Sequence, residues 1–176
     1  RELVCCAAGK SREELTRDSR LYVPDTVERQ ARQLVERHLA GEPVAYLIGE
    51  WEFYGLPLDI SERVLIPRPD TEVLAAAAIE GLQGVESPRV LDLCAGSGCI
   101  GLAVARHVSG SHVVLGEIDE GALRICRQNI RRTGLSGQVV SMQLNALEKA
   151  PPRLGEFDCI VSNPPYIPDG DIAGLD

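Results

Sequence analysis

The chain has 176 residues, of which 44% are hydrophobic and 25% are charged, so it can form one main domain and a smaller appendage. Its formal net charge of -8 disfavours a broad phosphate-binding surface, and we find no apolar run near the roughly 20 residues that cross a bilayer. The six cysteines have neither C-x-x-C spacing nor a nearby histidine pair, which predicts reduced thiols and no metal site. We expect a cytoplasmic monomer with no direct contact to membranes or nucleic acid.

The first 41 residues have the pattern of amphipathic helices. Asp25 followed by Glu28 is typical of a capping pair at a helix N-terminus, and the apolar residues after Asp25 recur on one helical face. These residues are Val27, Ala31, Leu34, Val35 and Leu39. Gly41 should end the helix, since glycine often follows a helix C-terminus.

A hairpin is expected between residues 49 and 66. Aromatic and β-branched residues are enriched here, and Gly55 and Pro57 interrupt them as turn residues do. The pattern predicts one strand over 50–54 and a second over 58–61. This segment has the character of a linker with secondary structure of its own.

From residue 70 onward, helices and short apolar strands alternate. The first helix should run through the alanine-rich stretch to about Gly81, with Asp70 as its cap. Four strands are expected at 89–93, 113–117, 139–142 and 158–162, and helices at 100–108 and 120–132 fill the first two intervals. This alternation predicts an α/β fold with a doubly wound parallel sheet. The sequence stops soon after the fourth strand, so we expect the sheet to be incomplete within it.

A glycine-rich turn follows the first of these strands. The sequence D-L-C-A-G-S-G starts at Asp92 and places Gly96 and Gly98 where the backbone can approach a ligand at the carboxyl end of the strand. Gly101 completes a G-x-G-x-x-G pattern, and Glu117, about 20 residues on, can accept hydrogen bonds from ribose hydroxyls. The turn predicts a nucleoside site, for which NAD and S-adenosylmethionine are both candidates.

Two further features favour S-adenosylmethionine over NAD. Asp92 stands before the turn, where it can hold the ammonium group of a ligand. The fourth strand is followed by Asn163, Pro164, Pro165 and Tyr166. The prolines fix the backbone, so the Asn163 side chain and the Pro164 carbonyl can accept from a substrate NH₂ group. Tyr166 can then pack on the planar face of that group, which predicts methylation of an amide or amine nitrogen.

The N-P-P-Y sequence after a D-x-x-x-G-x-G turn resembles methyltransferases that act on adenine N6, cytosine N4 or glutamine N5. Three upstream segments narrow the resemblance to the HemK/PrmC family of release-factor glutamine methyltransferases. They are G-E-P-V-A-Y-L-I-G over 41–49, E-F-Y over 52–54 and L-I-P-R-P-D-T-E over 65–72. The resemblance covers nearly the whole chain. It implies an N-terminal helical, substrate-docking domain over 1–48, a hairpin linker over 49–68 and a Rossmann-like methyltransferase domain over 69–176.

In this family the substrate is the glutamine of the Gly-Gly-Gln motif of peptide-chain release factors. The resemblance assigns to the cofactor Cys94, Ala95, Gly96, Ser97, Gly98 and Glu117, to which we add Asp92, Asn145 and Asn163. It assigns to the glutamine Asn163, Pro164, Pro165 and Tyr166, of which Asn163, Pro164 and Tyr166 are the expected catalytic residues. The segment 68–72 is expected to pack over the active site.

At three positions the chain departs from the family pattern. Glu117 stands where the family often has Asp, and it can still accept from ribose. Asn145 and Ala146 stand where the family commonly has an acidic residue and an aromatic one. Asn145 can still accept from an adenine amino group, whereas Ala146 removes a stacking surface, so we expect weaker adenine affinity.

Three alternatives remain open. A nucleic-acid amino-methyltransferase would hold an exocyclic amine with the same N-P-P-Y segment after base flipping. An NAD-dependent oxidoreductase would use the glycine turn but leaves Asn163 and Tyr166 without a role. A non-catalytic binding module is the third. The net charge and the upstream segments weigh against the first alternative.

Overall fold

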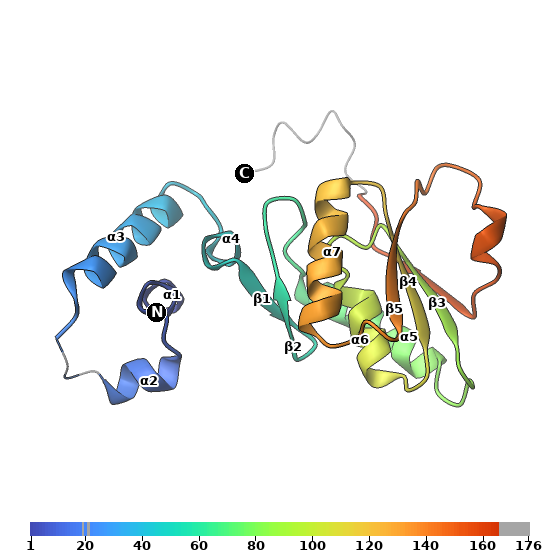
Figure 1. Ribbon diagram of the computed structural model, residues 1–176, viewed down its shortest axis with the longest axis horizontal. Helices are drawn as coiled ribbons and strands as arrows, with labels where there is room; N and C mark the ends of the chain where they lie inside the picture. The colour runs from blue at the N-terminus through green and yellow to red at the C-terminus, as the bar shows by residue number, and fades with distance from the viewer. Residues whose placement is uncertain (19, 21, 166–176) are drawn as a thin grey trace.

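The computed structural model describes residues 1–18, 20 and 22–165 of the chain. An N-terminal helical region is followed by a two-stranded hairpin and then by an α/β domain with a four-stranded parallel sheet (Figure 1). The hairpin lies between the N-terminal helices and the sheet. Within these described residues, we find no helix with the length and apolar character needed to cross a membrane.

The described part of the N-terminal region contains the helices α1 (Glu2–Ala8), α2 (Arg12–Arg17), α3 (Asp25–Leu39) and α4 (Val44–Ile48). A small core joins α1, α3 and α4, with Leu34 buried at its centre and two of the predicted residues of α3, Val27 and Ala31, packed against it. The other two apolar residues of the predicted face, Val35 and Leu39, are 41% and 80% exposed. Val35 lies about 100° around the helix from Leu34, outside the stripe that the neighbouring helices cover.

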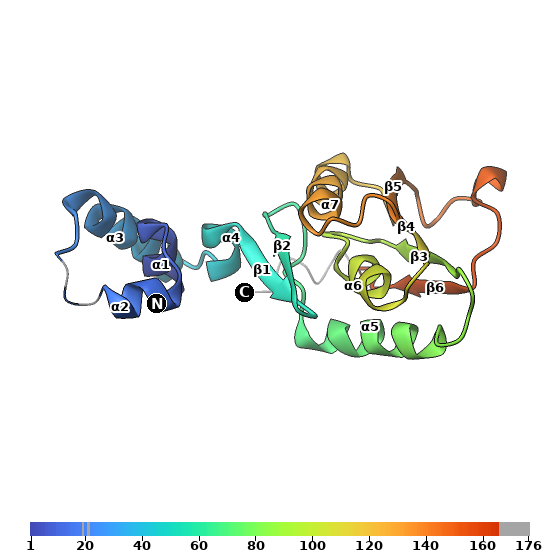
Figure 2. The same cartoon turned by 60° about the horizontal axis from the view of Figure 1, so that its bottom comes forward.

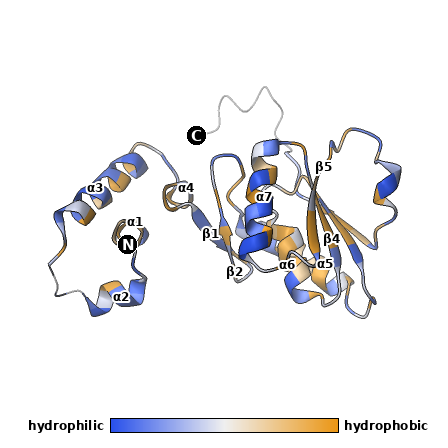
Figure 3. Cartoon of the chain, in the orientation of Figure 1, coloured by the Kyte–Doolittle hydropathy of each residue, from blue (hydrophilic) through white to orange (hydrophobic). Residues whose placement is uncertain are grey.

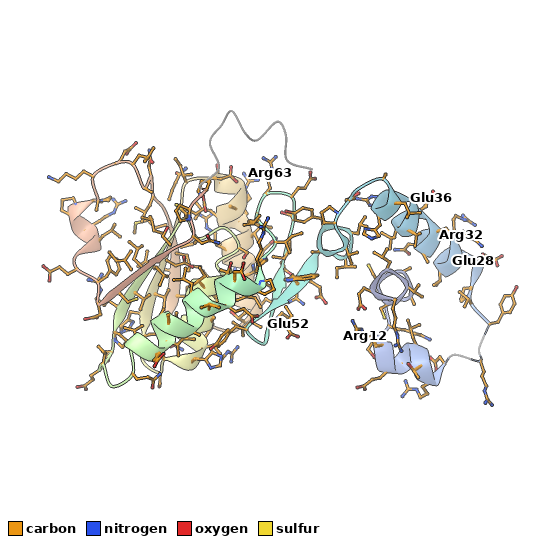
Figure 4. The ribbon with its side chains drawn as sticks, turned by 180° about the vertical axis from the view of Figure 1, so that it is seen from behind. Arg12, Glu28, Arg32, Glu36, Glu52 and Arg63 are labelled. Carbon is orange, nitrogen blue, oxygen red and sulfur yellow. The ribbon has the colours of Figure 1, made fainter. Side chains whose placement is uncertain are left out.

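The outer surface of this region carries ion pairs between exposed side chains. Arg32 lies 2.7 Å from Glu28, one turn earlier in α3 (Figure 4). Arg12 of α2 lies 2.5 Å from Glu2 of α1. Exposed pairs of this kind contribute little to stability, because water and salt screen the two charges and ordering the side chains costs entropy. The N-terminal region therefore depends mainly on its small apolar core.

Two predicted helix caps do not form. Helix α3 begins at Asp25 itself, after Pro24, which makes no side-chain cap. Helix α5 (Pro69–Gly81) has a proline in its first turn and Arg68 at the capping position, so Asp70 lies inside the helix. Proline fixes φ near the helical value, and the two carboxylates then favour only the positive end of each helix dipole.

The predicted hairpin is confirmed, with a shorter turn than expected. Strands β1 (Glu50–Phe53) and β2 (Leu56–Asp59) pair antiparallel. The turn consists of Tyr54 and Gly55, both with positive φ, at 51° and 74°. Pro57 lies within β2 rather than in the turn. A two-residue loop of this type matches the twist of the strands, which explains why it is preferred over a longer one.

All four predicted strands of the parallel sheet are present, as β3 (Arg89–Leu93), β4 (His112–Glu117), β5 (Val139–Gln143) and β6 (Cys159–Ser162). Their order is β5-β4-β3-β6. The chain moves outward from β3 to β5 and then crosses to the other side of β3. This reversal creates a switch point at the carboxyl end of β3, where ligands bind in open α/β sheets.

Helices α5, α6 (Cys99–His107) and α7 (Glu120–Arg132) cover one face of the sheet (Figure 2). The main core lies between them and includes the buried strand residues Val90, Val113, Val139 and Val161. Figure 3 shows this arrangement as apolar strands and an apolar α6, with a largely hydrophilic α7.

The opposite face is packed against the segment that joins β5 to β6. This segment contains a 3₁₀ turn, Pro152–Leu154, and forms a smaller core with the sheet. Val140 and Ile160, on the two outer strands, are 55% and 62% exposed. In the described part of the chain, the doubly wound sheet thus has helices on one face and an irregular segment on the other.

Candidate functional site

Three of the predicted site segments meet at the carboxyl edge of the sheet. The glycine turn follows β3, Glu117 is the last residue of β4, and Asn163 directly follows β6. Leu93 at the end of β3 pairs with Gly116 on one side and Ser162 on the other, so the three segments lie side by side. The parallel topology therefore brings together strand ends that lie far apart in sequence, such as Leu93 and Ser162.

The glycines of the turn have different roles. At Gly98 an added Cβ would lie 2.7 Å from the side chain of Leu115, and at Gly101 it would lie 2.4 Å from the same side chain. These two glycines let the start of α6 pack directly on β4. Gly96 has a φ of 55°, and an added Cβ there would meet nothing within 4 Å. The open space beside Gly96 is the place where a ligand can approach the backbone.

Glu117 is fixed by three backbone amides. Its Oε2 accepts from the Gly96 amide at 2.9 Å, and its Oε1 accepts from Ile118 and Asp119 at 2.7 and 3.1 Å. A carboxylate has about four acceptor positions, so a ribose hydroxyl can still donate to it. The residues present therefore fit a nucleoside: a fixed acceptor stands beside the open space at Gly96.

Asp92 lies under the turn rather than on its surface. It is 1% exposed, and its Oδ2 accepts from the Gly101 amide at 2.8 Å. Its Oδ1 has no hydrogen-bond partner among the described residues. Burial raises the pKa of Asp92 to about 7, with a further rise from Glu117 and an opposing effect of the Gly101 bond. Asp92 supports the start of α6, and its contact with a ligand's ammonium group stays a prediction.

Asn145 follows β5 at the same edge, where Leu144 donates its amide to the Glu117 carbonyl at 3.0 Å. The Asn145 side chain closes its own turn: Nδ2 donates to Glu148 at 2.9 Å, and Oδ1 accepts from the Leu147 amide at 3.0 Å. Its predicted bond to adenine would use the second lone pair of Oδ1. That contact also stays a prediction.

Sequence reasoning passed over two apolar residues at this edge. Ile118 directly follows Glu117 and is 55% exposed, and Leu147 is 95% exposed in the turn after Ala146. Exposed apolar side chains beside a nucleoside site can cover the faces of a base. The signal in the sequence is an apolar residue directly after the acid at a strand end.

Asn163 lies half-buried against the first turn of α5. Its Nδ2 donates to the Thr71 hydroxyl at 3.4 Å, and Thr71 is buried. This contact agrees with the expectation that the segment 68–72 packs over the active site, although Thr71 itself was not among the predicted site residues. Among the described residues, no group donates a hydrogen bond to Asn163 Oδ1. Pro164 and Pro165 are exposed. Tyr166 lies outside the described residues.

Comparison with solved structures places this architecture among methyltransferases. The human methyltransferase 10 domain containing protein aligns with a TM-score of 0.52 and 20% identity, over 77% of this chain and 61% of that one. The delta-N METTL16 MTase domain aligns with a TM-score of 0.53 and 23% identity, over 64% of this chain and 53% of that one. At these identities the likeness concerns the fold. The sheet and its flanking helices have the Rossmann-like methyltransferase fold.

Family models and curated relatives identify the family. Residues 71–173 match the methyltransferase small domain, and residues 1–49 match the PrmC N-terminal domain. The release factor glutamine methyltransferase of Chlorobaculum tepidum is 39% identical over 151 residues, which is 82% of this chain and 51% of that protein. The Bordetella pertussis protein of the same name is 41% identical over 159 residues, covering 90% and 58%.

The chain belongs to the HemK/PrmC family of methyltransferases. This membership supports S-adenosylmethionine, rather than NAD, as the cofactor of the glycine turn. The chain spans about half the length of the curated relatives that it matches, 51% and 58% in these two cases.

Proposed function

We propose that the protein transfers a methyl group from S-adenosylmethionine to the side-chain amide N5 of the glutamine in the Gly-Gly-Gln motif of a peptide-chain release factor. It would thereby act in translation termination. The observation that carries the proposal is the position of Asn163, whose carbonyl has no donor among the described residues and which lies at the same sheet edge as Glu117. The names of the relatives, release factor glutamine methyltransferase, support the choice of substrate.

The cofactor supplies a methyl group already activated on a sulfonium, so the protein mainly has to position the acceptor nitrogen and exclude water. Glu117 would accept from the ribose hydroxyls, and the open backbone at Gly96 would contact the ligand. Ile118 and Leu147 would cover the base with apolar surface. The turn from Cys94 to Gly98 would form the floor of this site.

The glutamine nitrogen is a poor nucleophile because its lone pair is delocalised into the carbonyl. Hydrogen bonds from its NH₂ group to Asn163 Oδ1 and to the Pro164 carbonyl would favour pyramidalisation, with acceptors already in place for the transition state. Thr71 would hold the Asn163 side chain in the orientation that presents Oδ1. We keep the proposed role of Tyr166, packing on the amide plane, as part of this hypothesis.

We assign the partner contact to the N-terminal helices, with domains over 1–48, 49–68 and 69–176. The release factor would present its Gly-Gly-Gln loop to the edge beside Asn163 while the helices bind the rest of the substrate domain. Release factors act on ribosomes, so we infer a cytoplasmic location. We also infer that the protein works as a monomer.

Methyl transfer from labelled S-adenosylmethionine tests the proposal with the full-length protein. We expect label in a release factor, none in the same release factor with its Gly-Gly-Gln glutamine replaced by alanine, and none in duplex DNA. Methylation of DNA with no methylation of release factor would overturn the substrate assignment. Thermal stabilisation by NAD but not by S-adenosylhomocysteine would overturn the cofactor assignment as well, because a ligand that binds the folded state raises its stability.

A further inference from the structure

Asn129 of α7 is the most fully bonded buried polar side chain near the glycine turn. It is 0% exposed and makes three hydrogen bonds. Its Oδ1 accepts from the Asp59 amide at 2.6 Å, while its Nδ2 donates to the carbonyls of Asp59 and Ser97 at 3.1 and 2.9 Å. Asp59 is the last residue of the hairpin, and Ser97 belongs to the predicted cofactor turn. One side chain thus joins two parts of the molecule that the sequence separates.

The hairpin register explains why Asp59 needs such a partner. Asp59 lies opposite Glu50, and the next residue, Ile60, donates its amide to the Gly49 carbonyl at 2.9 Å. Hydrogen-bonded and non-hydrogen-bonded pairs alternate along an antiparallel ladder, so the amide and carbonyl of Asp59 point away from β1. Asn129 takes the place of a third strand at this point. Among buried side chains of this length, only a primary amide offers the two donors and one acceptor required.

Residues of α7 before and after Asn129 contact the same two segments, the glycine turn and the hairpin. Three residues earlier, the Cys126 thiol donates to the Gly96 carbonyl at 3.1 Å. Three residues later, Arg132 pairs with Asp59 and, at 2.5 Å, with Glu50 on the other hairpin strand. Residues spaced by three lie on one face of a helix. This face of α7 therefore runs from the glycine turn, through Asn129, to both strands of the hairpin.

We propose that Asn129 is a positioning residue that couples the cofactor turn to the linker hairpin, so that a ligand bound at the turn also stabilises the hairpin. The hairpin follows directly from α4 and connects the N-terminal helices to the sheet. A ligand that restrains the Ser97 carbonyl would also restrain the Asn129 side-chain amide, which donates to it. The same side chain bonds to the backbone of Asp59 and would therefore restrain the end of β2. Ligand binding would in this way hold the protein-docking region in place beside the active site. The proposal rests on the proposed function for the identity of the ligand and for the docking role of the N-terminal helices.

Hydrogen exchange of the full-length protein with and without S-adenosylhomocysteine tests this coupling directly. The reporter is the Asp59 amide, which donates to Asn129 and lies outside the cofactor turn. With saturating ligand, we expect exchange of the Asp59 amide to slow on the order of tenfold in the wild type. Ligand binding stabilises by mass action the state in which this amide is hydrogen-bonded to Asn129, and exchange requires that this bond opens. The Gly96 amide, which donates to Glu117, reports on the turn itself.

Two substitutions separate coupling from simple support of the fold. Asn129→Asp keeps the shape and one acceptor but loses both donors, and Asn129→Ser removes the bridge without adding a charge. In either variant we expect ligand to protect the Gly96 amide as in the wild type while protection of the Asp59 amide disappears. Gln128→Ala, at an exposed neighbouring position of α7, is the matched control and should behave as the wild type.

The wild-type measurement alone can refute the proposal, even if neither variant folds. Protection of Gly96 without protection of Asp59 would overturn the coupling and leave the proposed function intact. Protection of neither amide would overturn the cofactor assignment together with the coupling. Retained protection of Asp59 in a folded Asn129→Ser protein would show that Asn129 is a structural residue only.

Discussion

The two halves of the candidate site are held in different ways. In the cofactor half, Glu117 accepts from three backbone amides, and α7 bonds two successive carbonyls of the turn, those of Gly96 and Ser97. In the predicted substrate half, the hydrogen bonds of the described residues give Asn163 one partner, Thr71, at 3.4 Å. The prolines after it are exposed.

This difference indicates which half has its binding geometry fixed by the chain and which half needs a bound substrate to fix it. Backbone donors that are fixed before a ligand arrives need no reorganisation on binding, so the cofactor half is prepared by the chain itself. Within residues 1–18, 20 and 22–165, the predicted substrate half presents the amide carbonyl of Asn163, which has no donor in that part of the chain. Its final geometry would therefore depend on the contacts that a protein substrate brings.

Replacing Asn163 should have the largest effect, and it should be confined to the substrate half. Asn163→Ala removes the proposed acceptor for the glutamine NH₂ group, which typically costs on the order of 10²–10³ in kcat. The dissociation constant for S-adenosylhomocysteine, measured by calorimetry, should be nearly unchanged.

The Asn163→Asp variant keeps an acceptor at this position and adds a charge near the sulfonium. We expect it to bind cofactor more tightly and still to turn over slowly, since the glutamine is misplaced. If both variants methylate a release factor at the wild-type rate, Asn163 has a structural role only. The predicted substrate half would then not be the place where the glutamine binds.

Asp92 offers a test of the cofactor half through pH. Burial raises the pKa of Asp92 from its ordinary value of 3.8 to about 7 in the folded protein, so between these pH values the folded state holds a proton that the unfolded state has released. Its contribution to stability is therefore complete below about pH 4 and is lost as the pH rises through 7. A shift of this size corresponds to at most a few kcal/mol.

Asp92→Asn should remove that dependence, because the amide oxygen can still accept from Gly101 and carries no charge. We expect urea unfolding of the ligand-free variant to show a gain over the wild type at pH 8 that shrinks at pH 5. Comparing variant with wild type cancels the titration of the other carboxylates. An equal difference at both pH values would mean that Asp92 is ionised in the folded state like an exposed acid.

Thr71 should have the smallest effect, since it acts on Asn163 and not on the substrate. Thr71→Val removes one long hydrogen bond, which should be worth no more than the about 0.5–1.5 kcal/mol of a typical bond and predicts at most roughly a tenfold lower kcat. Thr71→Ser keeps the hydroxyl and should restore most of the rate. If the serine variant is as slow as the valine variant, the methyl group of Thr71, and not its hydroxyl, supports the site.

The sheet and the positions of the main motifs could be predicted because each depends on local patterns. Short apolar strands alternate with amphipathic helices, and the glycine turn stands directly after a strand, so the parallel order places Glu117 and Asn163 beside it. The same reasoning failed where a neighbour decides the outcome. Val35 continues the apolar pattern of α3 but is 41% exposed, and Pro24 and Arg68, rather than Asp25 and Asp70, occupy the capping positions of α3 and α5.

Residues that connect distant segments could not be predicted from one sequence. In the sequence, Asn129 is one of many polar residues of a hydrophilic helix. In the structure it is buried and hydrogen-bonds to Asp59, 70 positions earlier. In the sequence, Thr71 is an ordinary residue of the first turn of α5. In the structure its hydroxyl accepts a hydrogen bond from Asn163, 92 positions later. Their partners are set by topology, which spacing within a single helix does not encode.

The hairpin turn has a consequence for the order of folding. Tyr54 adopts φ 51° at a position where glycine or asparagine is favoured, so the isolated hairpin carries a local conformational cost. In the folded chain, the Tyr54 amide donates to Glu72 of α5 at 3.1 Å, and its ring packs edge-on against His107 at the end of α6. Both supports come later in the chain. During synthesis the hairpin should therefore acquire its final form only after residue 107 has left the ribosome, so the N-terminal helices are made well before the linker that positions them.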